Sequence, residues 1–289
     1  MIKKQKKKKA PFYENRIVLF IDFLGFKEIV IKTTSNESEL HRLVKAMDRL
    51  GKIGDTLFSA SKMATQFSDS IVLSYRVEEE SAVFDLLNDM AFCVIDLANM
   101  GYLVRGGVTY GELYHTDQHV VGPGMIKAYE LESKCAQVPR VLIDENLLEI
   151  AMEHRNSIHS REEEAEYVKC LMTRDPDGRY FFDYVSFNSV VAVTGCDRED
   201  YPDYLRRLGE LIKKGLAHKE LLVRAKYVWL HNHYLAAIEC IESLPLDHGF
   251  RVNENEISED ILSLPKLIPE AEKVRREAVD KKLNIVGLV

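Results

Sequence analysis

The alternation of apolar and polar residues predicts a strand-helix-strand-strand-helix-strand order for the first part of the chain. A continuous apolar run predicts a buried strand, and two shorter runs joined by a tight Ser68–Asp69 turn predict a hairpin. Apolar residues at helical spacing predict a long helix that Gly101 ends. The predicted elements are a strand over residues 16–23, a helix over 37–52 capped by Asn36 or Ser38, strands over 62–67 and 70–75, a helix over 79–100 and a strand over 102–110.

This order predicts an α+β fold with the ferredoxin-like arrangement, in which one antiparallel sheet carries helices on one face. Later in the chain, a nearly continuous helix is predicted over residues 201–243, with Gly215 as its candidate break. The other predicted elements are a short element at 119–121, a helix over 125–135, a strand over 140–143, a helix over 145–152, and a late hairpin of strands 167–172 and 180–185 around the turn Asp175-Pro176-Asp177-Gly178.

The pattern divides the chain into three parts. Residues 1–15 form a lysine-rich tail, residues 16–190 the α+β domain, and residues 191–289 a helical C-terminal extension that packs on the core or at a dimer contact. The tail holds six lysines between Lys3 and Lys9, and such a block is typical of a disordered solubilising segment. A membrane-surface tether is the alternative, but no amphipathic stretch or lipidation signal accompanies the lysines.

The composition narrows the classes of function. A hydrophobic content of 46% over 289 residues is enough for one large core, and the net charge of −7 argues against a basic nucleic-acid-binding surface. No apolar run approaches the roughly 20 residues of a membrane span, so stable membrane insertion is not expected. The five cysteines are widely spaced and form no CxxC pair, which favours a reduced, cytoplasmic protein without a zinc site.

Two aspartates stand at the ends of predicted strands. Asp22 closes the first apolar strand before the Gly25 turn, and Asp69 lies in the hairpin turn. Either aspartate alone is more often a structural cap or turn residue. Two carboxylates held together, however, repel each other unless a cation lies between them. The pair therefore predicts a divalent-metal site, and the Gly25 turn beside it predicts a phosphate site.

Residues two apart in a strand share a face, and this rule predicts the surroundings of the site. Phe20 shares a face with Asp22 in the first strand, and Thr65 shares a face with Asp69 in the hairpin. If the helices cover the opposite face, Arg105 of the fourth strand joins them. Phe20, Thr65 and Arg105 are therefore expected to shape a ligand pocket.

Four segments carry motifs in a consistent order and spacing. They are Leu19-Phe20-Ile21-Asp22-Phe23-Leu24-Gly25-Phe26, then Gln66-Phe67-Ser68-Asp69-Ser70, then Arg105-Gly106-Gly107-Val108-Thr109-Tyr110-Gly111-Glu112, and finally Val121-Gly122-Pro123-Gly124-Met125 through Ala128 to Leu131-Glu132. Together they resemble the class III nucleotidyl cyclases, the catalytic domain of adenylate and guanylate cyclases. The resemblance spans about residues 16–145.

The resemblance implies an enzyme that converts a nucleoside triphosphate to the 3′,5′-cyclic monophosphate and pyrophosphate, in a homodimer with shared active sites. It implies that two Mg²⁺ or Mn²⁺ ions lower the pKa of the ribose 3′-hydroxyl and bind the phosphates. Such chemistry needs positioning and charge neutralisation more than a side-chain base, so no catalytic histidine is required. The expected site residues are Asp22, Asp69 and Arg105 for catalysis, Asp22, Asp69 and the Phe23 carbonyl for the metals, and Phe20, Phe23, Leu24, Gly25, Phe26, Thr65 and Lys134 for the nucleotide.

The sequence departs from the family pattern at four positions. Ile126 stands where the family has its transition-state asparagine, and Glu130 stands where it has an arginine. Thr65 and His119 stand where the family has the lysine and aspartate that read a purine base. The candidates for the missing positive charge are Arg105, Lys127 and Lys134 nearby and Lys169 and Arg179 farther away.

The absent purine readers and a helical C-terminal segment such as residues 226–230 make the chain most similar to the bacterial pyrimidine cyclases of anti-phage, Pycsar-type systems. That subgroup makes cyclic UMP or cyclic CMP on infection, and the messenger activates a separate effector. The resemblance therefore implies a uridylate cyclase, with a cytidylate cyclase as the second choice. Two alternatives remain open, a purine cyclase that recognises its base differently and a non-catalytic nucleotide-binding scaffold.

Other polar or aromatic residues are interpreted as structural. His231 and His233 are two apart in a predicted helix and so do not share a face. Trp229 is expected to anchor that helix on the domain or at a dimer contact. The run 162–164 of three glutamates is expected to be a solvated face, and Cys135 has no evident histidine partner for nucleophilic chemistry.

Overall fold

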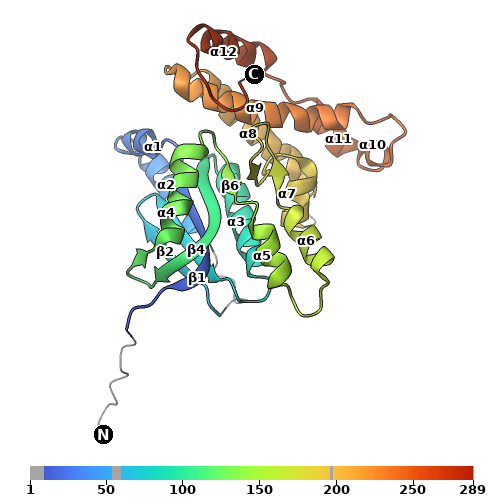
Figure 1. Ribbon diagram of the computed structural model, residues 1–289. Coiled ribbons are helices and arrows are strands. Elements are labelled where there is room, and N and C mark those ends of the chain that lie inside the picture. The colour runs from blue at the N-terminus through green and yellow to red at the C-terminus, as the bar shows by residue number, and fades with distance from the viewer. Residues whose placement is uncertain (1–9, 54–59, 196–197, 289) are drawn as a thin grey trace.

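The computed structural model describes residues 10–53, 60–195 and 198–288 (Figure 1). The predicted tail between Lys3 and Lys9 lies outside these residues. The described strands form one sheet in the order β2-β3-β1-β4-β6-β8-β7, with β5 paired to β4. The strands are β1 (Glu14–Phe23), β2 (Met63–Phe67), β3 (Ser70–Arg76), β4 (Val104–His115), β5 (Val120–Val121), β6 (Val141–Ile143), β7 (Thr173–Arg174) and β8 (Tyr180–Phe181).

The strands pair antiparallel except for β4 and β6, which are parallel. The predicted α+β fold class is confirmed, because β1, α2, β2, β3, α3 and β4 follow one another in the predicted order. Helix α1, between β1 and α2, is absent from that prediction. The helices are α1 (Phe26–Thr33), α2 (Glu37–Gly51), α3 (Ala82–Asn99), α4 (Pro123–Glu130) continued by a π-helical turn (Leu131–Cys135), α5 (Leu147–Glu153), α6 (Arg161–Lys169), α7 (Phe187–Thr194), α8 (Tyr201–Leu216), α9 (Leu221–Glu242), α10 (Gly249–Asn253), α11 (Asn255–Leu262) and α12 (Ile268–Asp280).

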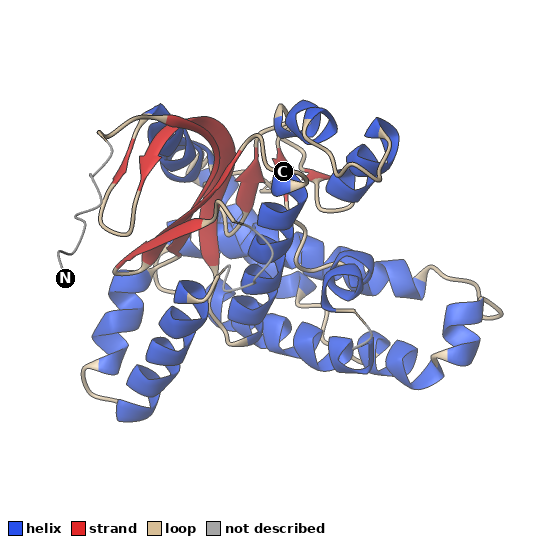
Figure 2. Ribbon diagram, turned by 90° about the horizontal axis from the view of Figure 1, so that it is seen from below, coloured by secondary structure: helices blue, strands red, loops and turns tan. Residues whose placement is uncertain are grey.

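The sheet is curved and has helices on both sides (Figure 2). On one face of β1, Ile17 and Leu19 belong to the main core, to which α2 and α3 contribute. On the other face, Val18 and Phe20 pack with Ala128 of α4 in a smaller buried cluster. The predicted alternation along β1 is therefore confirmed. The expectation that helices cover one face alone is wrong, because α4 covers part of the second face.

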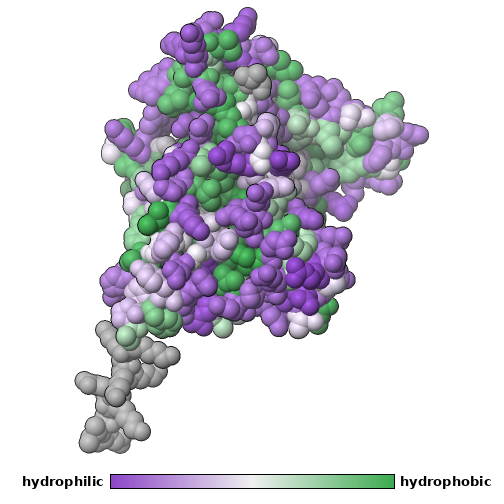
Figure 3. Space-filling view, in the orientation of Figure 1, coloured by the Kyte–Doolittle hydropathy of each residue, from purple (hydrophilic) through white to green (hydrophobic). Residues whose placement is uncertain are grey.

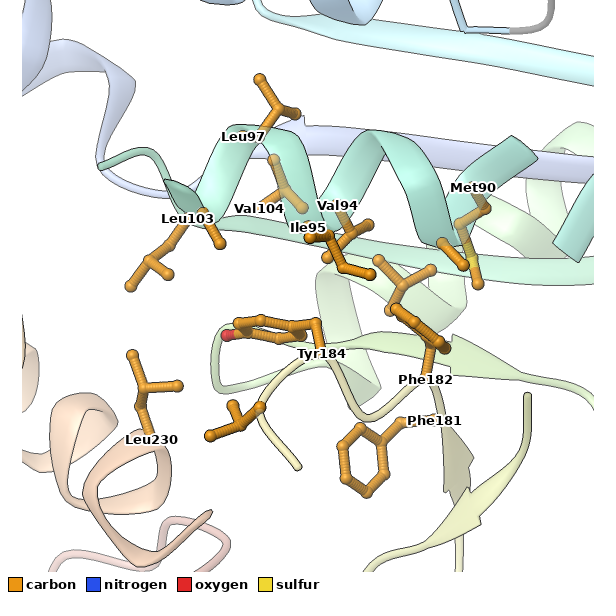
Figure 4. Packing of buried hydrophobic residues seen from close by; sticks show 14 of the residues in the cluster. Met90, Val94, Ile95, Leu97, Leu103, Val104, Phe181, Phe182, Tyr184 and Leu230 are labelled. Atoms are coloured by element: carbon orange, nitrogen blue, oxygen red, sulfur yellow. The ribbon is translucent and has the colours of Figure 1, made fainter. Parts of the chain in front are cut away.

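The C-terminal helices share the main core with the sheet. Leu230 of α9 belongs to the same buried cluster as Leu103 and Tyr184, and all three lie in the region shown in Figure 4. Trp229, one residue earlier, donates its indole N–H to Asp175 Oδ2 over 2.9 Å. Its predicted role as an anchor of this helix is confirmed, since the contact ties α9 to the turn between β7 and β8.

The predicted long helix over residues 201–243 is two helices. Helix α8 ends at Leu216 and α9 begins at Leu221, close to the expected break at Gly215. A Cβ at Gly215 would lie 2.2 Å from the Tyr227 ring, so the absence of a side chain there lets α8 and α9 approach closely.

The predicted strand over residues 167–172 is wrong, because residues 167–169 are the end of α6 and a turn follows them at residues 170–171. Ser160 caps α6 by accepting from the Glu163 N–H, while the Glu163 side chain accepts from the Ser160 N–H. This capping box outweighs the strand preference of the apolar residues that follow. The expectation of a fully solvated glutamate run also fails at Glu164, which is buried and bonded to His159 Nδ1 at 2.8 Å. The late hairpin does form around the predicted turn, but as β7 and β8.

The face seen in Figure 3 is mostly hydrophilic, with smaller hydrophobic patches among the polar residues. In the part of the chain that the structure describes, none of the helices combines the length and the apolar character that crossing a membrane requires.

Candidate functional site

The site is built where β1 ends beside the β2–β3 hairpin. Asp22 lies opposite Ser70 of β3 on one side and opposite Arg105 of β4 on the other. The backbone N–H of Phe23 donates to the carbonyl of Asp69 over 3.3 Å, which fixes the hairpin turn against the end of β1. The carboxyl groups of Asp22 and Asp69 lie within hydrogen-bonding reach of each other. The structure thus brings together the two aspartates that the sequence singled out.

The electrostatics of this pair are unfavourable without a cation. Burial, and then the neighbouring charges of Asp69 and Glu132, raise the pKa of Asp22 to about 7, while the charge of Arg105 opposes them. Near neutral pH, Asp22 therefore holds a proton that it can share with Asp69. A divalent cation would replace that proton and remove the repulsion between the two carboxylates.

Arg105 connects this pair to a buried glutamate. Its Nη2 lies 2.5 Å from Glu132 Oε1 and 3.9 Å from Asp22 Oδ2. Only 4% of the Glu132 side chain is exposed, and burial raises the pKa of its carboxyl, while the charges of Arg105 and Lys226 lower it. Arg105 is thus held by Glu132, in a position to orient Asp22. The sequence predicted no role for Glu132, although this residue is the last one of the fourth motif.

The turn after β1 presents backbone rather than side chains. Gly25 has a φ of 75°, and open space surrounds the position of a Cβ there. Its carbonyl accepts from the N–H groups of Glu28 and Ile29, which begins α1. The first N–H groups of a helix have no acceptor within it, so those of Phe26 and Lys27 remain available to an anion. The predicted phosphate turn therefore has suitable backbone geometry.

The predicted pocket residues Phe20 and Thr65 share the expected face but are mostly covered by this chain. Phe20 is 7% exposed and its ring lies 5.8 Å from that of Tyr129 on α4. Thr65 is 9% exposed and bonds to His115 Nε2 over 3.0 Å. Each therefore offers a bound molecule little more than the edge of its side chain.

The remaining predicted nucleotide residues fall into two groups. Phe23 and Phe26 stack with ring centres 6.1 Å apart, and Leu24 bonds through its N–H to the Leu103 carbonyl, so all three help to fix the turn. Lys134 is exposed and bonds to Glu130 Oε1 over 2.5 Å. It lines a separate surface hollow that also contains Arg179 and Cys135. The structure therefore does not group Lys134 with the aspartate pair.

Two of the four positions that depart from the family pattern, Ile126 and Glu130, lie on α4. Ile126 is 61% exposed, and Glu130 forms the exposed ion pair with Lys134. Lys127 lies over the Tyr110 ring at 5.3 Å. Helix α4 thus presents apolar and acidic side chains at the two positions where the family has polar and basic ones.

The donor set suits a hard divalent cation. Carboxylate and carbonyl oxygens are the protein ligands that Mg²⁺ and Mn²⁺ prefer. Among the described residues, no group of three or more histidine, cysteine, aspartate or glutamate side chains is arranged to hold a metal. Asp22 and Asp69 would therefore supply only part of a coordination shell, and phosphate oxygens and water would complete it.

Comparisons with known proteins gave structural similarity only. The chain matches no family model and no curated protein sequence. It is similar to the crystal structure of the adenylyl cyclase CyaB from P. aeruginosa, with 14% identity, a TM-score of 0.42, and coverage of 61% of this chain and 97% of that chain. It is also similar to a bacterial light-regulated adenylyl cyclase, with 15% identity and a TM-score of 0.40 over 50% of this chain and 47% of that chain. A further structure of a bacterial light-regulated adenylyl cyclase gives 13% identity and a TM-score of 0.37 over 50% and 46% of the two chains. The aligned part thus spans about half the length of the light-regulated cyclases.

Proposed function

We propose that this protein is a nucleotidyl cyclase that uses two divalent metal ions. The observation that carries the proposal is the contact between the Asp22 and Asp69 carboxyl groups, which adds to burial in raising the pKa of Asp22 to about 7. A structural ion pair would place a cationic side chain between two such groups. Here the nearest cation, Arg105, lies 3.9 Å from Asp22 and is held at 2.5 Å by Glu132. Arg105 therefore neutralises the pair only in part, and a metal ion would complete the neutralisation.

In the proposed reaction, the ribose 3′-oxygen attacks the α-phosphorus of a nucleoside triphosphate. The new 3′-oxygen–phosphorus bond forms as the bond to the bridging oxygen breaks, so pyrophosphate leaves with that electron pair and the hydroxyl proton passes to solvent. Asp22 and Asp69 would hold Mg²⁺ or Mn²⁺, and the Phe23 carbonyl would be a further ligand. Bound metal would lower the pKa of the 3′-hydroxyl and neutralise the phosphates.

The other residues orient and bind. Arg105 positions Asp22 through its contact with Glu132. The N–H groups at the start of α1, beyond Gly25, receive phosphate oxygens. Phe20 and Thr65 contribute their exposed edges to the nucleotide site. Because the reaction depends on alignment and charge neutralisation, these groups suffice without a general base.

The substrate proposed is UTP, with CTP as the second choice, for synthesis of a second messenger in antiviral defence. Support comes from Thr65 and His119, which replace the two purine-reading residues of the class III cyclases that the motifs resemble. Thr65 is bonded to His115 and offers no amine for a purine carbonyl. A separate cyclic-nucleotide effector in the cytoplasm would read the product.

A homodimer is part of this proposal. Helix α4 exposes Ile126 and Tyr129, at 61% and 52%, on the same side of the sheet as Phe20. An apolar contact with a second copy would cover them and bring a partner surface to the nucleotide site.

The test is incubation of purified protein with ATP, GTP, CTP or UTP and Mn²⁺, followed by chromatographic identification of products. Cyclic UMP as the main product supports the whole proposal, and cyclic CMP supports its second choice. Cyclic AMP or cyclic GMP as the sole product would refute pyrimidine specificity and leave a purine cyclase. No cyclic product from any of the four would favour a non-catalytic nucleotide-binding scaffold, to which the replacements at Ile126 and Glu130 also point.

A further inference from the structure

A cavity of about 320 Å³ lies between the turn after β1 and the C-terminal helices α8 and α9. Leu24 and Gly25 form one side, together with α1, and Tyr227 of α9 is part of the other. His218, in the loop between α8 and α9, lies 3.1 Å from Glu28 of α1 and closes one edge. Figure 1 shows α1 and α9 at the same end of the sheet, opposite the N-terminus.

The cavity is rich in cationic side chains. Lys27 and Lys32 come from α1, Lys214 comes from α8, and Lys226 comes from α9. Glu28 is the one carboxylate among the described lining residues, and it already contacts His218. Four ammonium groups around one small cavity favour an anion that carries several charges.

Lys226 is the lysine that links this cavity to Arg105 and Glu132, which lie beside the aspartate pair. It is half-buried, and burial together with the charge of Arg105 lowers its pKa, while Glu132 raises it. Glu132 is itself held by Arg105 at 2.5 Å. Within the described ranges, no carboxylate forms an ion pair with Lys226. A partly desolvated ammonium group without its own counter-ion gains from an incoming anion more than a fully hydrated one does.

Helix α4, which packs on the face of β1 that carries Phe20 and Asp22, offers no comparable set of cations among the described residues. This helix exposes Ile126, its Glu130 pairs with Lys134, and its Lys127 lies over the Tyr110 ring. Leu24 and Gly25 of the proposed phosphate turn line the lysine-rich cavity, so a phosphate bound at that turn would lie beside its ammonium groups.

We propose that Lys226, supported by Lys214, binds the terminal phosphates of the nucleoside triphosphate, so that the C-terminal helices supply the phosphate-binding charge from within the same chain. This inference rests on the proposed cyclase function, which it deepens by giving α8 and α9 a direct role at the site. It also explains why the extension is packed against the core, since displacement of α9 would remove Lys226 from the cavity.

The test measures binding of inorganic tripolyphosphate by calorimetry, without metal and without a nucleoside. Lys226→Gln is expected to weaken binding by about 10- to 100-fold, the loss of one charge-assisted contact. Lys214→Gln is expected to weaken it less. Lys213→Gln is the matched control, because Lys213 is exposed on the same helix as Lys214 but does not line the cavity. Lys226→Arg keeps the charge and is expected to retain most of the affinity.

The outcomes separate this inference from the proposed function. A Lys226→Gln variant that binds tripolyphosphate as tightly as the natural protein, or a natural protein that does not bind it, would overturn the inference. Natural protein that binds tripolyphosphate through Lys226 but forms no cyclic nucleotide would uphold the inference and refute the cyclase. If Lys226→Gln unfolds at a lower temperature than the natural protein, Lys226→Arg is compared with Lys213→Gln instead. If both of these variants are folded and only Lys226→Arg binds tripolyphosphate weakly, the inference is overturned.

Discussion

Two groups of carboxylates in this protein have opposite electrostatic surroundings. Asp175, with a side chain only 1% exposed, bonds to the Arg140 guanidinium and to the Trp229 indole N–H. Asp22, with a side chain 25% exposed, faces Asp69, while its nearest cation stays 3.9 Å away. The more deeply buried aspartate is thus the better compensated one. Pairing, more than depth of burial, distinguishes a structural carboxylate from one that is kept for a cation.

The two groups also occupy different parts of the fold. Asp175 joins the β7–β8 turn to α9, so its bonds hold the C-terminal helices on the sheet. Asp22 lies near the end of a strand and Asp69 lies in a hairpin turn. Few hydrogen bonds between strands depend on the backbone at such positions. We therefore expect substitutions at the first group to change stability and substitutions at the second to change activity.

The largest expected effect is on catalysis. Asp69→Asn should lower the rate of cyclic nucleotide formation on the order of 10³-fold, because it removes one of the two carboxylates proposed to bind the metal ions. The free energy of unfolding should stay constant or rise, because the like-charge contact with Asp22 is gone. Single-turnover product formation and urea unfolding measure the two quantities. An Asp69→Asn variant with a normal rate would contradict the two-metal proposal.

A comparable effect on stability is expected at the other group. Asp175→Asn should lower the free energy of unfolding by about 3–5 kcal/mol, because it leaves the buried Arg140 without a main counter-ion. Asp177→Asn is the matched control. Asp177 also bonds to Arg140, at 2.6 Å, but its side chain is 17% exposed, so a smaller loss is expected. If urea unfolding gave equal losses of free energy for the two variants, the buried pairing of Asp175 would not differ in strength from that of Asp177.

The sequence allowed the aspartate pair to be predicted because both residues stand in local patterns. An apolar strand that ends in Asp22 and Gly25, and a short hairpin around Asp69, are readable without knowledge of the rest of the fold. The α+β class followed from the same periodicity. The strand predicted over residues 167–172 failed because a capping box upstream set a helix, a signal that the apolar run concealed.

Glu132 and Lys226 could not be found in this way. Glu132 lies in a π-helical turn, and its burial depends on the packing of that turn against the sheet. Lys226 comes close to Arg105 and Glu132 only because α9 folds back across the end of the sheet. The Arg140–Asp175 bond likewise joins residues 35 positions apart. Contacts of this range depend on tertiary packing, and residue spacing alone does not encode them.

His115 is a third buried titratable group, and its burial keeps it neutral in the folded protein. Burial, and then the charge of Arg16, lower the pKa of His115 from 6.5 to about 4, and its ring bonds to Ser74 and Thr65. The unfolded chain therefore takes up a proton at a higher pH than the folded one. Stability should fall as the pH drops from about 6.5 to about 4, by about 3 kcal/mol at most.

The measurement is urea unfolding at several pH values for the natural protein and for His115→Gln. Other groups titrate in the same range, so the difference between the two proteins isolates the histidine. The glutamine variant should show a shallower loss of stability on acidification. Parallel curves would mean that His115 is not kept neutral in the folded protein.

The smallest expected effect concerns the backbone of the proposed phosphate turn. Gly25 has a φ of 75° and open space around it, so Gly25→Ala should cost only the conformational penalty of roughly 1–2 kcal/mol. Gly25→Asn should cost less, because asparagine adopts this conformation more readily. Gly215→Ala is the contrasting case, since its Cβ would lie 2.2 Å from the Tyr227 ring and force α8 and α9 apart. Thermal unfolding should therefore rank the variants Gly25→Asn, Gly25→Ala and Gly215→Ala in order of increasing loss of stability. If Gly25→Asn proved less stable than Gly25→Ala, the left-handed conformation assigned to this turn would be refuted.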